Sequence, residues 1–359
     1  MCRRYILKID KILEHFKILY NEINVKTPIS VSYDITKRCN LNCKHCYNNI
    51  SEEDDYLDSI EKMNLLVDKL AELNIIEVTL CGGEPLISDY ILEIVRKLKS
   101  RDIAIRIITN GIMLDSYIED FVELLDDKDV IQISIDEPLH ITLDQRYHSQ
   151  NIKAKVYNNL SVVAKKLENV IANITPTKLN QSHIVDIVTD CADHNAKYIS
   201  STPYIPIRGE KADLIKPDYS YLYFVEKKIV EICKKRNINY LGGISGHPCQ
   251  QRGHIEVSSE LRTCKYRSCD AARTNMHISS NGSIFPCVFF QNEDFVISDI
   301  RNDSNKILND FKKFNLLENV ILPEKCQNCD RLAICNGGCV GLIYSRTGSI
   351  LNVDPRCEY

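Results

Sequence analysis

Three cysteines within eight residues near the N-terminus limit what this chain can be. Cys39, Cys43 and Cys46 follow the spacing Cys-x3-Cys-x2-Cys, directly after a β-rich run at 29–35. Cysteine thiolates hold iron–sulfur clusters, normally four to a cluster, so three sulfurs can hold a four-iron cube whose remaining iron is open to a substrate. From this stretch alone, half of a zinc site or three buried cysteines at helical spacing are the alternatives.

The composition indicates a globular chain and argues against two classes of partner. Of its 359 residues, 44% are hydrophobic, which is enough for one large or two moderate domains. The formal charge of −4 provides no basic field for a phosphate backbone, so we expect no nucleic-acid partner. No apolar run approaches about 18 residues, so we expect no secretory signal, no membrane span and a cytoplasmic location.

The sixteen cysteines are unevenly distributed. Three lie at 39–46, and nine lie between Cys249 and Cys357. In a cytoplasmic protein such groups favour metal ligation over disulfides. The other four are scattered and are most simply small buried hydrophobic residues: Cys2, Cys81, Cys191 and Cys233.

Hydrophobic periodicity predicts six alternating strand and helix units up to about residue 240, after an amphipathic helix at 6–20. The expected strands are 29–35, 75–80, 103–108, 130–135, 169–174 and 197–201. The expected helices are 59–73, 88–99, 116–126, 154–167, 181–194 and 218–236. Such units imply parallel strands with helices outside them, and an open or closed barrel is one natural arrangement.

Short polar motifs follow four of the expected strands, at the ends where barrel enzymes build active sites. They are Cys81-Gly82-Gly83-Glu84-Pro85, Thr109-Asn110-Gly111, Ser134-Ile135-Asp136 and the segment from Thr202 to Gly209. In the first, paired glycines let the backbone approach a ligand, the Glu84 carboxylate can bind an ammonium group, and Pro85 stiffens the turn. Taken singly, each motif also reads as an ordinary turn or cap.

The C-terminal region has weak periodicity and many thiols after a glycine-rich boundary at 241–246. Asn281-Gly282 lies between the apolar runs 276–278 and 284–285, which predicts a β-hairpin. The cysteines there are Cys269, Cys287, the run Cys326-x2-Cys329-x5-Cys335-x3-Cys339, and Cys357. Two zinc ribbons would need paired Cys-x2-Cys knuckles, which this spacing lacks.

The thiol triplet, followed by Gly-Gly-Glu-Pro some 35 residues later, resembles radical S-adenosylmethionine (SAM) enzymes. The seven C-terminal cysteines resemble the SPASM extension of that family. The resemblance implies a partial (β/α)6 TIM-like barrel at 29–241 after a helical segment at 1–28. It also implies a small cysteine-rich SPASM domain at 242–359, with a β-hairpin and short helices.

The resemblance further implies three [4Fe-4S] clusters, one binding SAM and two auxiliary. The SAM cluster would use Cys39, Cys43 and Cys46. The first auxiliary cluster would use Cys269, Cys287 and Cys339, with Cys264 as the fourth ligand and Cys249 in reserve. The second would use Cys326, Cys329, Cys335 and Cys357.

The family pattern assigns a further set of residues to the binding of SAM: His45, Tyr47, Gly82, Gly83, Glu84, Pro85, Asn110, Ser134, Asp136, Arg146 and Ile205. Arg146 would contact the SAM carboxylate, although a solvated surface arginine is the alternative. The family usually has glycine after Ser-x-Asp, whereas this chain has Glu137-Pro138, so we expect a different local backbone. Tyr204, Arg208 and Arg273 are chosen by position alone as catalytic candidates.

The function that the resemblance implies is reductive cleavage of SAM to a 5′-deoxyadenosyl radical, with oxidative modification of a ribosomally made peptide by a thioether, carbon–carbon or similar bond. A haem-precursor enzyme and an anaerobic sulfatase maturase are alternatives, but sulfatase maturases generally have an acid where this chain has Val288. An iron–sulfur electron carrier or zinc scaffold is the non-enzymatic alternative. The implied partners are a peptide, a flavodoxin- or ferredoxin-type reductant and a separate recognition protein.

Overall fold

The structure is a computed structural model that describes residues 26–48, 55–205, 214–244, 269–317, 320–335 and 337–357. The helix expected at 6–20 lies outside the described residues. So do Arg208, Cys249 and Cys264.

The described strands form one ten-stranded sheet in the order β10-β9-β8-β1-β2-β3-β4-β5-β6-β7. Neighbouring strands from β1 to β7 run parallel. Their bounds are β1 Ser30–Thr36, β2 Glu77–Gly82, β3 Ala104–Thr109, β4 Val130–Ser134, β5 Val170–Ile174, β6 Tyr198–Ser201 and β7 Asn239–Tyr240. The six expected strands are confirmed, and the short β7 follows them.

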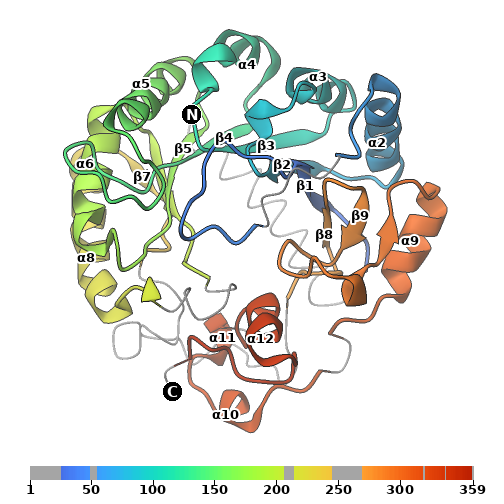
Figure 1. The fold of residues 1–359 in the computed structure, drawn as a ribbon. Coiled ribbons are helices and arrows are strands. Elements are labelled where there is room, and N and C mark those ends of the chain that lie inside the picture. The colour runs from blue at the N-terminus through green and yellow to red at the C-terminus, as the bar shows by residue number, and fades with distance from the viewer. Residues whose placement is uncertain are drawn as a thin grey trace.

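An α-helix follows each of the first six strands, which confirms the alternation of strands and helices. The helices are α2 Ile60–Glu72, α3 Ile91–Ser100, α4 Ile118–Leu124, α5 Gln150–Lys166, α6 Ile184–Asp193 and α8 Tyr219–Lys235. Short 3-10 turns precede α3, α4 and α6: η1 Pro85–Ile87, η2 Leu114–Ser116 and η3 Gln181–His183. Figure 1 shows the strands as an open arc with these helices on its outside.

Burial explains why these segments adopt their structures. All five residues of β5 are buried, as expected for a parallel strand covered on both faces. In α2, Met63, Leu66 and Leu70 recur at helical spacing and are fully buried. The Ser59 side chain accepts a hydrogen bond from the backbone N–H of Lys62 and so caps that helix.

The C-terminal region extends the barrel sheet. The predicted hairpin is confirmed as β8 Asn275–Ile278 and β9 Ser283–Phe285, followed by β10 Ser298–Asp299. Strand β8 pairs in parallel with β1, so the sheet continues across the domain border expected at 241/242. Pairing between strands some 245 residues apart has no local sequence signal, which is why periodicity missed it.

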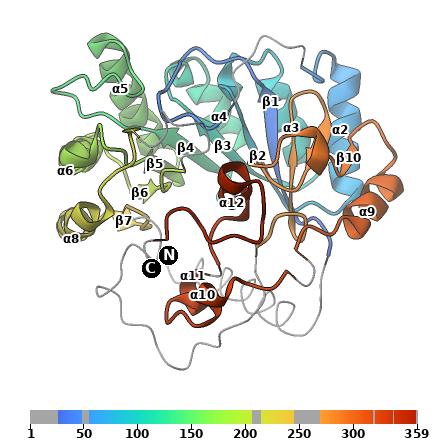
Figure 2. The same cartoon turned by 60° about the horizontal axis from the view of Figure 1, so that its bottom comes forward.

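Four helices complete the described part of the C-terminal region: α9 Ser304–Lys313, α10 Glu324–Gln327, α11 Leu332–Cys335 and α12 Val340–Thr347. The strands form an arc with one open side, and three of these helices lie next to that opening: α10, α11 and α12 (Figures 1 and 2). The C-terminal region therefore covers the open side of the barrel.

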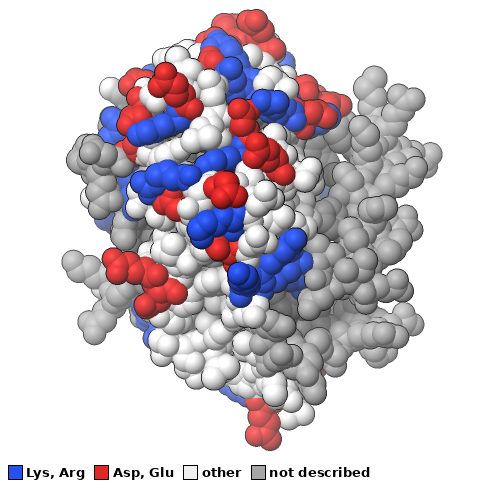
Figure 3. All heavy atoms as spheres, turned by 90° about the vertical axis from the view of Figure 1, so that its right-hand side faces the viewer, with Lys and Arg blue, Asp and Glu red and all other residues white. Residues whose placement is uncertain are grey.

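Basic and acidic side chains are interspersed on the face of the molecule shown in Figure 3. Among the described residues, surface pairs of opposite charge include Lys62 with Asp58 and Lys306 with Asp310. No field of a single sign dominates the described part of that face. In the part of the chain that the structure describes, no helix is long and apolar enough to cross a membrane.

Candidate active site

A cavity of about 330 Å³ lies at the carboxyl ends of the barrel strands. The loop after β1 contributes Cys39, Leu41, Cys43, His45, Cys46, Tyr47 and Asn48 to its wall. The other strand ends contribute Cys81, Gly82, Gly83, Glu84, Thr109, Asn110, Ser134 and Arg146. The motifs expected at the strand ends are thus brought together around one cavity.

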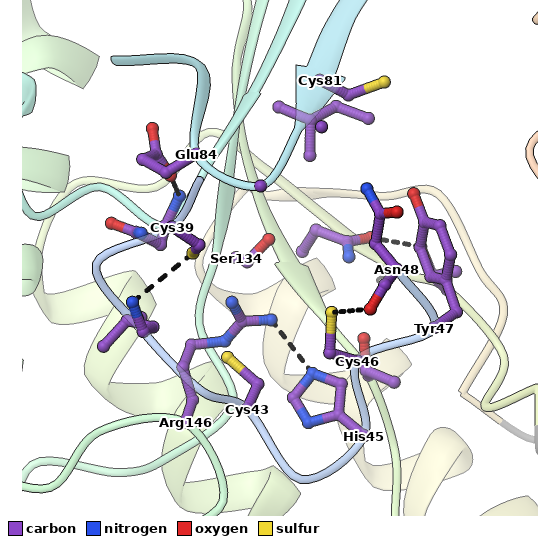
Figure 4. A pocket seen from close by; sticks show the side chains of 18 of the residues that line it. Cys39, Cys43, His45, Cys46, Tyr47, Asn48, Cys81, Glu84, Ser134 and Arg146 are labelled. Atoms are coloured by element: carbon purple, nitrogen blue, oxygen red, sulfur yellow. Dashed lines mark hydrogen bonds between the residues drawn. The ribbon is translucent and has the colours of Figure 1, made fainter. Parts of the chain in front are cut away.

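The three clustered thiols face this cavity without forming disulfides. Figure 4 shows Cys39, Cys43 and Cys46 around its centre, whereas the sulfur of Cys81 points away from them. The Cys81 thiol instead donates a hydrogen bond to Asp34 Oδ1 at 3.4 Å. Cys81 is therefore engaged outside the group of three.

The spacing of the three thiols does not suit a single zinc ion. Zinc–sulfur bonds of ~2.3 Å in a tetrahedron place the sulfurs about 3.8 Å apart. Among the described residues, only His140, His183 and Asp186 bring three candidate ligand atoms within 4.8 Å of one another. The wider spacing of the cysteines fits a larger group held between them, as an iron–sulfur cluster is.

Two glycines hold the loop after β2 tightly against the cysteine loop. The backbone N–H of Gly83 donates to Thr36 O at 2.8 Å, and that of Glu84 donates to Arg38 O at 2.9 Å. A Cβ on Gly82 would collide with the Thr36 carbonyl oxygen, and a Cβ on Gly83 with that of Arg38. The glycines therefore permit close contact between two loops, in addition to the ligand approach expected from the sequence.

The Glu84 carboxylate is buried and bonded to protein donors. Its Oε1 accepts hydrogen bonds from Thr109 Oγ1 at 2.6 Å and Leu86 N at 3.1 Å, and its Oε2 accepts from Asn110 N at 2.7 Å. Burial raises the pKa of this carboxyl, against the effect of those donors. Glu84 thus joins the ends of β2 and β3, and the Asn110 side chain continues the link by donating to Asn40 Oδ1 at 2.7 Å.

A buried charge group lies on the opposite side of the cysteine loop. Asp136 Oδ2 is 2.6 Å from Arg146 Nε and 3.2 Å from His45 Nε2, while its Oδ1 accepts from Thr175 N at 2.6 Å. The Arg146 guanidinium and His45 hold the pKa of Asp136 well below its usual range despite burial. Arg146 Nη2 also lies 3.1 Å from His45 Nε2 (Figure 4). Arg146 is therefore a fixed cavity residue, whereas Asp136 lies behind it and does not line the wall.

Burial also affects the clustered thiols. It raises the pKa of Cys43 to about 11, although nearby Arg146 acts in the opposite direction. It raises the pKa of Cys39 as well. Thiolates at these positions need a cation to neutralise them, which is what a bound metal provides.

Several cavity residues were not found from the sequence. Gln132 on β4 and Asn173 on β5 contribute side-chain amides, and Val288 with Phe289 forms an apolar part of the wall from the C-terminal region. Polar residues inside the Ile- and Val-rich strands were the available signal for the amides. The placement of Val288 and Phe289 depends on long-range packing, including the edge-to-face contact of Phe289 with Tyr47 at 5.3 Å.

Of the remaining predicted residues that the structure describes, two line the cavity and two do not. Tyr204, which is buried, and Ile205 line the cavity. Pro85 is buried at the start of η1 and is not among the lining residues. Arg273 lies in the turn before β8, where its carbonyl accepts from Thr27 N at 3.0 Å, and it does not line the cavity either.

The C-terminal cysteines form two groups. Cys269, Cys287 and Cys339 lie close enough to influence one another electrostatically, and burial raises the pKa of all three. A separate small cavity is lined by Cys326, Cys329, Cys335 and Cys357. The structure thus separates the seven described C-terminal cysteines into a set of three and a set of four.

One buried ion pair connects the two C-terminal groups. Asp354 Oδ2 accepts from the backbone N–H of Cys339 at 2.8 Å and from Arg356 Nη2 at 2.9 Å. Arg356 directly precedes Cys357. The pair therefore ties a cysteine of one group to the segment that carries a cysteine of the other.

Comparison with known proteins gives two family matches and similar full-length relatives. Residues 33–191 match the radical SAM superfamily, and residues 269–330 match the SPASM iron–sulfur cluster-binding domain. The chain is 21% identical to mycofactocin maturase MftC of Mycolicibacterium smegmatis, over 97% of this chain and 86% of that protein. It is 24% identical to the AdoMet-dependent heme synthase of Methanosarcina barkeri, over 92% of this chain and 97% of that protein.

Among solved structures, Streptococcus suis SuiB bound to its precursor peptide SuiA has a similar fold. The TM-score is 0.73 at 18% identity, with 98% of this chain and 80% of that chain covered. The fold, the three-thiol loop and both family matches agree with one another. The chain therefore contains a radical SAM domain, matched over residues 33–191, and a SPASM domain, matched over residues 269–330.

Proposed function

We propose that this enzyme cleaves SAM at a [4Fe-4S] cluster held by Cys39, Cys43 and Cys46 and uses the resulting radical to oxidise a ribosomally made peptide. The observation that carries the proposal is the convergence of three thiols, a glycine-rich loop and a buried arginine on one cavity. Bound there, the cluster would supply the electron that splits the sulfonium and generates the 5′-deoxyadenosyl radical.

The chain's own residues would orient SAM. Arg146 is charged, lines the cavity and is suited to a charge-assisted contact with the methionine carboxylate. The Gly82-Gly83 backbone lies at the wall where the methionine amino group would bind. Tyr204 and Ile205 also line the cavity and would pack against the adenosine. The apolar surface of Val288 and Phe289 would help to exclude water from the reacting atoms.

The C-terminal groups support net oxidation. We assign one auxiliary cluster to Cys269, Cys287 and Cys339, with Cys264 as its fourth ligand, and a second to Cys326, Cys329, Cys335 and Cys357. Held by these cysteines, the clusters would supply a one-electron acceptor for oxidation of the substrate. A flavodoxin or ferredoxin would supply the reducing electron for SAM cleavage.

A peptide substrate is favoured by the relatives. MftC is named as a maturase of mycofactocin, and SuiB is bound to a precursor peptide. The matched heme synthase supports tetrapyrrole chemistry as a second candidate. The cavity wall has Val288 where sulfatase maturases generally have an acid, which argues against that third reaction.

The test is product analysis under anaerobic conditions. Reconstituted and reduced protein should contain about twelve irons and convert SAM to 5′-deoxyadenosine, detected by mass spectrometry. A variant with Cys39, Cys43 and Cys46 replaced by Ala should lose this activity and keep about eight irons. A short precursor peptide encoded beside the gene should lose hydrogen atoms in the presence of the wild-type enzyme. Cleavage of SAM by the triple variant would contradict the site assignment.

A further inference from the structure

Glu137 is a fully buried acid at the position where the family pattern expects glycine. Its carboxylate accepts hydrogen bonds from four backbone N–H groups of one downstream loop. Oε2 accepts from Leu143 at 2.8 Å. Oε1 accepts from Gln145 at 2.9 Å, Arg146 at 2.8 Å and Tyr147 at 3.0 Å. The side chain therefore fixes the path of residues 143–147.

This loop carries the cavity arginine. Asp136 and Glu137, which are adjacent in the chain, hold Arg146 in two ways. Asp136 pairs with the guanidinium, with Arg146 Nε 2.6 Å from its Oδ2, and Glu137 holds the backbone N–H of the same residue. The position of Arg146 is thus defined at both its backbone and its charged end.

The same loop supports the cysteine loop. The Gln145 carbonyl accepts a hydrogen bond from Lys44 N at 3.0 Å, between Cys43 and His45 in the sequence. Gln145 is one of the residues whose N–H groups Glu137 binds. A change at Glu137 would therefore reach both the arginine and the thiols.

Glu137 is itself well anchored. Its backbone carbonyl accepts from Tyr157 Oη at 3.0 Å, and the preceding Asp136 carbonyl accepts from Asn180 Nδ2 at 3.1 Å. Tyr157 lies on α5 and is fully buried. The barrel wall thus fixes the backbone at Glu137, and the Glu137 carboxylate in turn fixes residues 143–147.

We propose that Glu137 is a positioning residue that sets Arg146, and through Gln145 the cysteine loop, for binding of the SAM carboxylate. This inference rests on the proposed function. Without the carboxylate, four backbone N–H groups lose their acceptor, and the loop must rearrange to satisfy them.

The test measures SAM affinity apart from turnover. Oxidised holoprotein carrying Glu137→Ala is compared with wild type by equilibrium dialysis against labelled SAM, by iron content and by thermal unfolding. Asp129→Ala is the matched control, because Asp129 is also buried and accepts from two backbone N–H groups, Ile105 at 2.8 Å and Asp126 at 2.9 Å, but neither of these residues lines the cavity as Arg146 does. Both variants should lose stability, while only Glu137→Ala should weaken SAM binding, by at least about tenfold.

A second variant keeps the inference testable if Glu137→Ala does not fold. Glu137→Gln preserves the shape and one oxygen acceptor, so it should fold with its iron content unchanged and bind SAM with an intermediate affinity. Equal SAM affinity in wild type and Glu137→Gln, or an equal loss in both alanine variants, would overturn the positioning role while leaving the proposed function intact. Failure of wild-type holoprotein to bind SAM would overturn the proposed function itself, and this inference with it.

Discussion

The two cysteine regions of this molecule are built in different ways. The barrel site takes three cysteines from eight residues of sequence and holds them with strand ends and buried carboxylates. The C-terminal groups take cysteines from a stretch of about ninety residues, from Cys269 to Cys357, among short helices. In the barrel the protein forms the site, whereas in the C-terminal region we expect the metal to form much of the structure.

The barrel also has a larger hydrophobic core than the region around the second cysteine group. The main core runs through the barrel helices and strands, and it includes β8 and β9. Around the second cysteine group, the described cluster consists of Leu322, Cys326 and Leu332, with Val353 packed against it. So small a cluster buries little apolar surface, which leaves that segment dependent on other interactions.

The largest expected effect is that of iron removal. In iron-free protein, trypsin should cut the segment 320–357 at least about tenfold faster than in reconstituted protein, because metal binding there is coupled to folding. The barrel segment 55–205 should remain protected in both states. Limited proteolysis with mass spectrometry of the fragments measures this difference. Equal protection of 320–357 with and without iron would show that this region is stable without metal.

A second prediction concerns the buried pair Asp136–Arg146 in the barrel. Asp136→Asn removes one charge and leaves Arg146 buried without its partner, so the free energy of unfolding at pH 7 should fall by about 3–5 kcal/mol. Urea unfolding measures this. Lys44→Ala breaks the exposed pair Lys44–Asp144 and serves as a control with no measurable change expected.

The difference in free energy of unfolding between wild type and Asp136→Asn should depend on pH in a defined direction. The pKa of Asp136 is lower in the folded protein than in the unfolded chain, so its contribution is complete above the ordinary aspartate pKa of about 3.9 and is lost as pH falls below that value. The gap between wild type and Asp136→Asn should therefore be constant from pH 7 to about 5 and shrink in more acidic buffer. If this stability difference instead grew on acidification, the stabilising role of the Asp136–Arg146 ion pair would be contradicted.

The smallest effects are expected from two glycine substitutions, one in each region. Gly83→Ala places a methyl group against the Arg38 backbone carbonyl, which cannot move without shifting the cysteine loop. It should cost about 1–3 kcal/mol of stability and lower the SAM affinity. For Gly338→Ala, the three heavy atoms nearest to the added methyl group belong to the Asp354 side chain, and the φ of +86° also disfavours alanine. It should cost about 1 kcal/mol and leave SAM binding unchanged. SAM titration of both variants would separate the two regions, and an equal loss of affinity would contradict their independence.

Local sequence patterns predicted much of the barrel and part of the site. The six strand and helix units follow from periodicity, because each segment buries a regular face. The placement of Asn110 and Ser134 at the cavity follows from their positions at strand ends. Asn281-Gly282 predicted the β8–β9 turn, where Gly282 has a φ of +93°.

Long-range contacts could not be predicted in this way. The buried pair of Asp34 on β1 and His277 on β8, 3.4 Å apart, exists only because those strands are neighbours. Glu84 was expected to bind an ammonium group, and its engagement with Thr109 and Asn110 depends on how two loops meet. The role of Glu137 was visible only as a departure from the family pattern.

The central claim is that the barrel cluster has an iron without a cysteine ligand and that SAM binds to that iron. Electron–nuclear double resonance of the reduced protein, with SAM labelled by ¹⁵N in its amino group and ¹⁷O in its carboxylate, tests this directly. We predict magnetic coupling of both labels to the cluster, and its loss in the Cys39, Cys43 and Cys46 triple alanine variant. Absence of coupling in the wild type, or zinc in place of iron at these three thiols, would contradict the account.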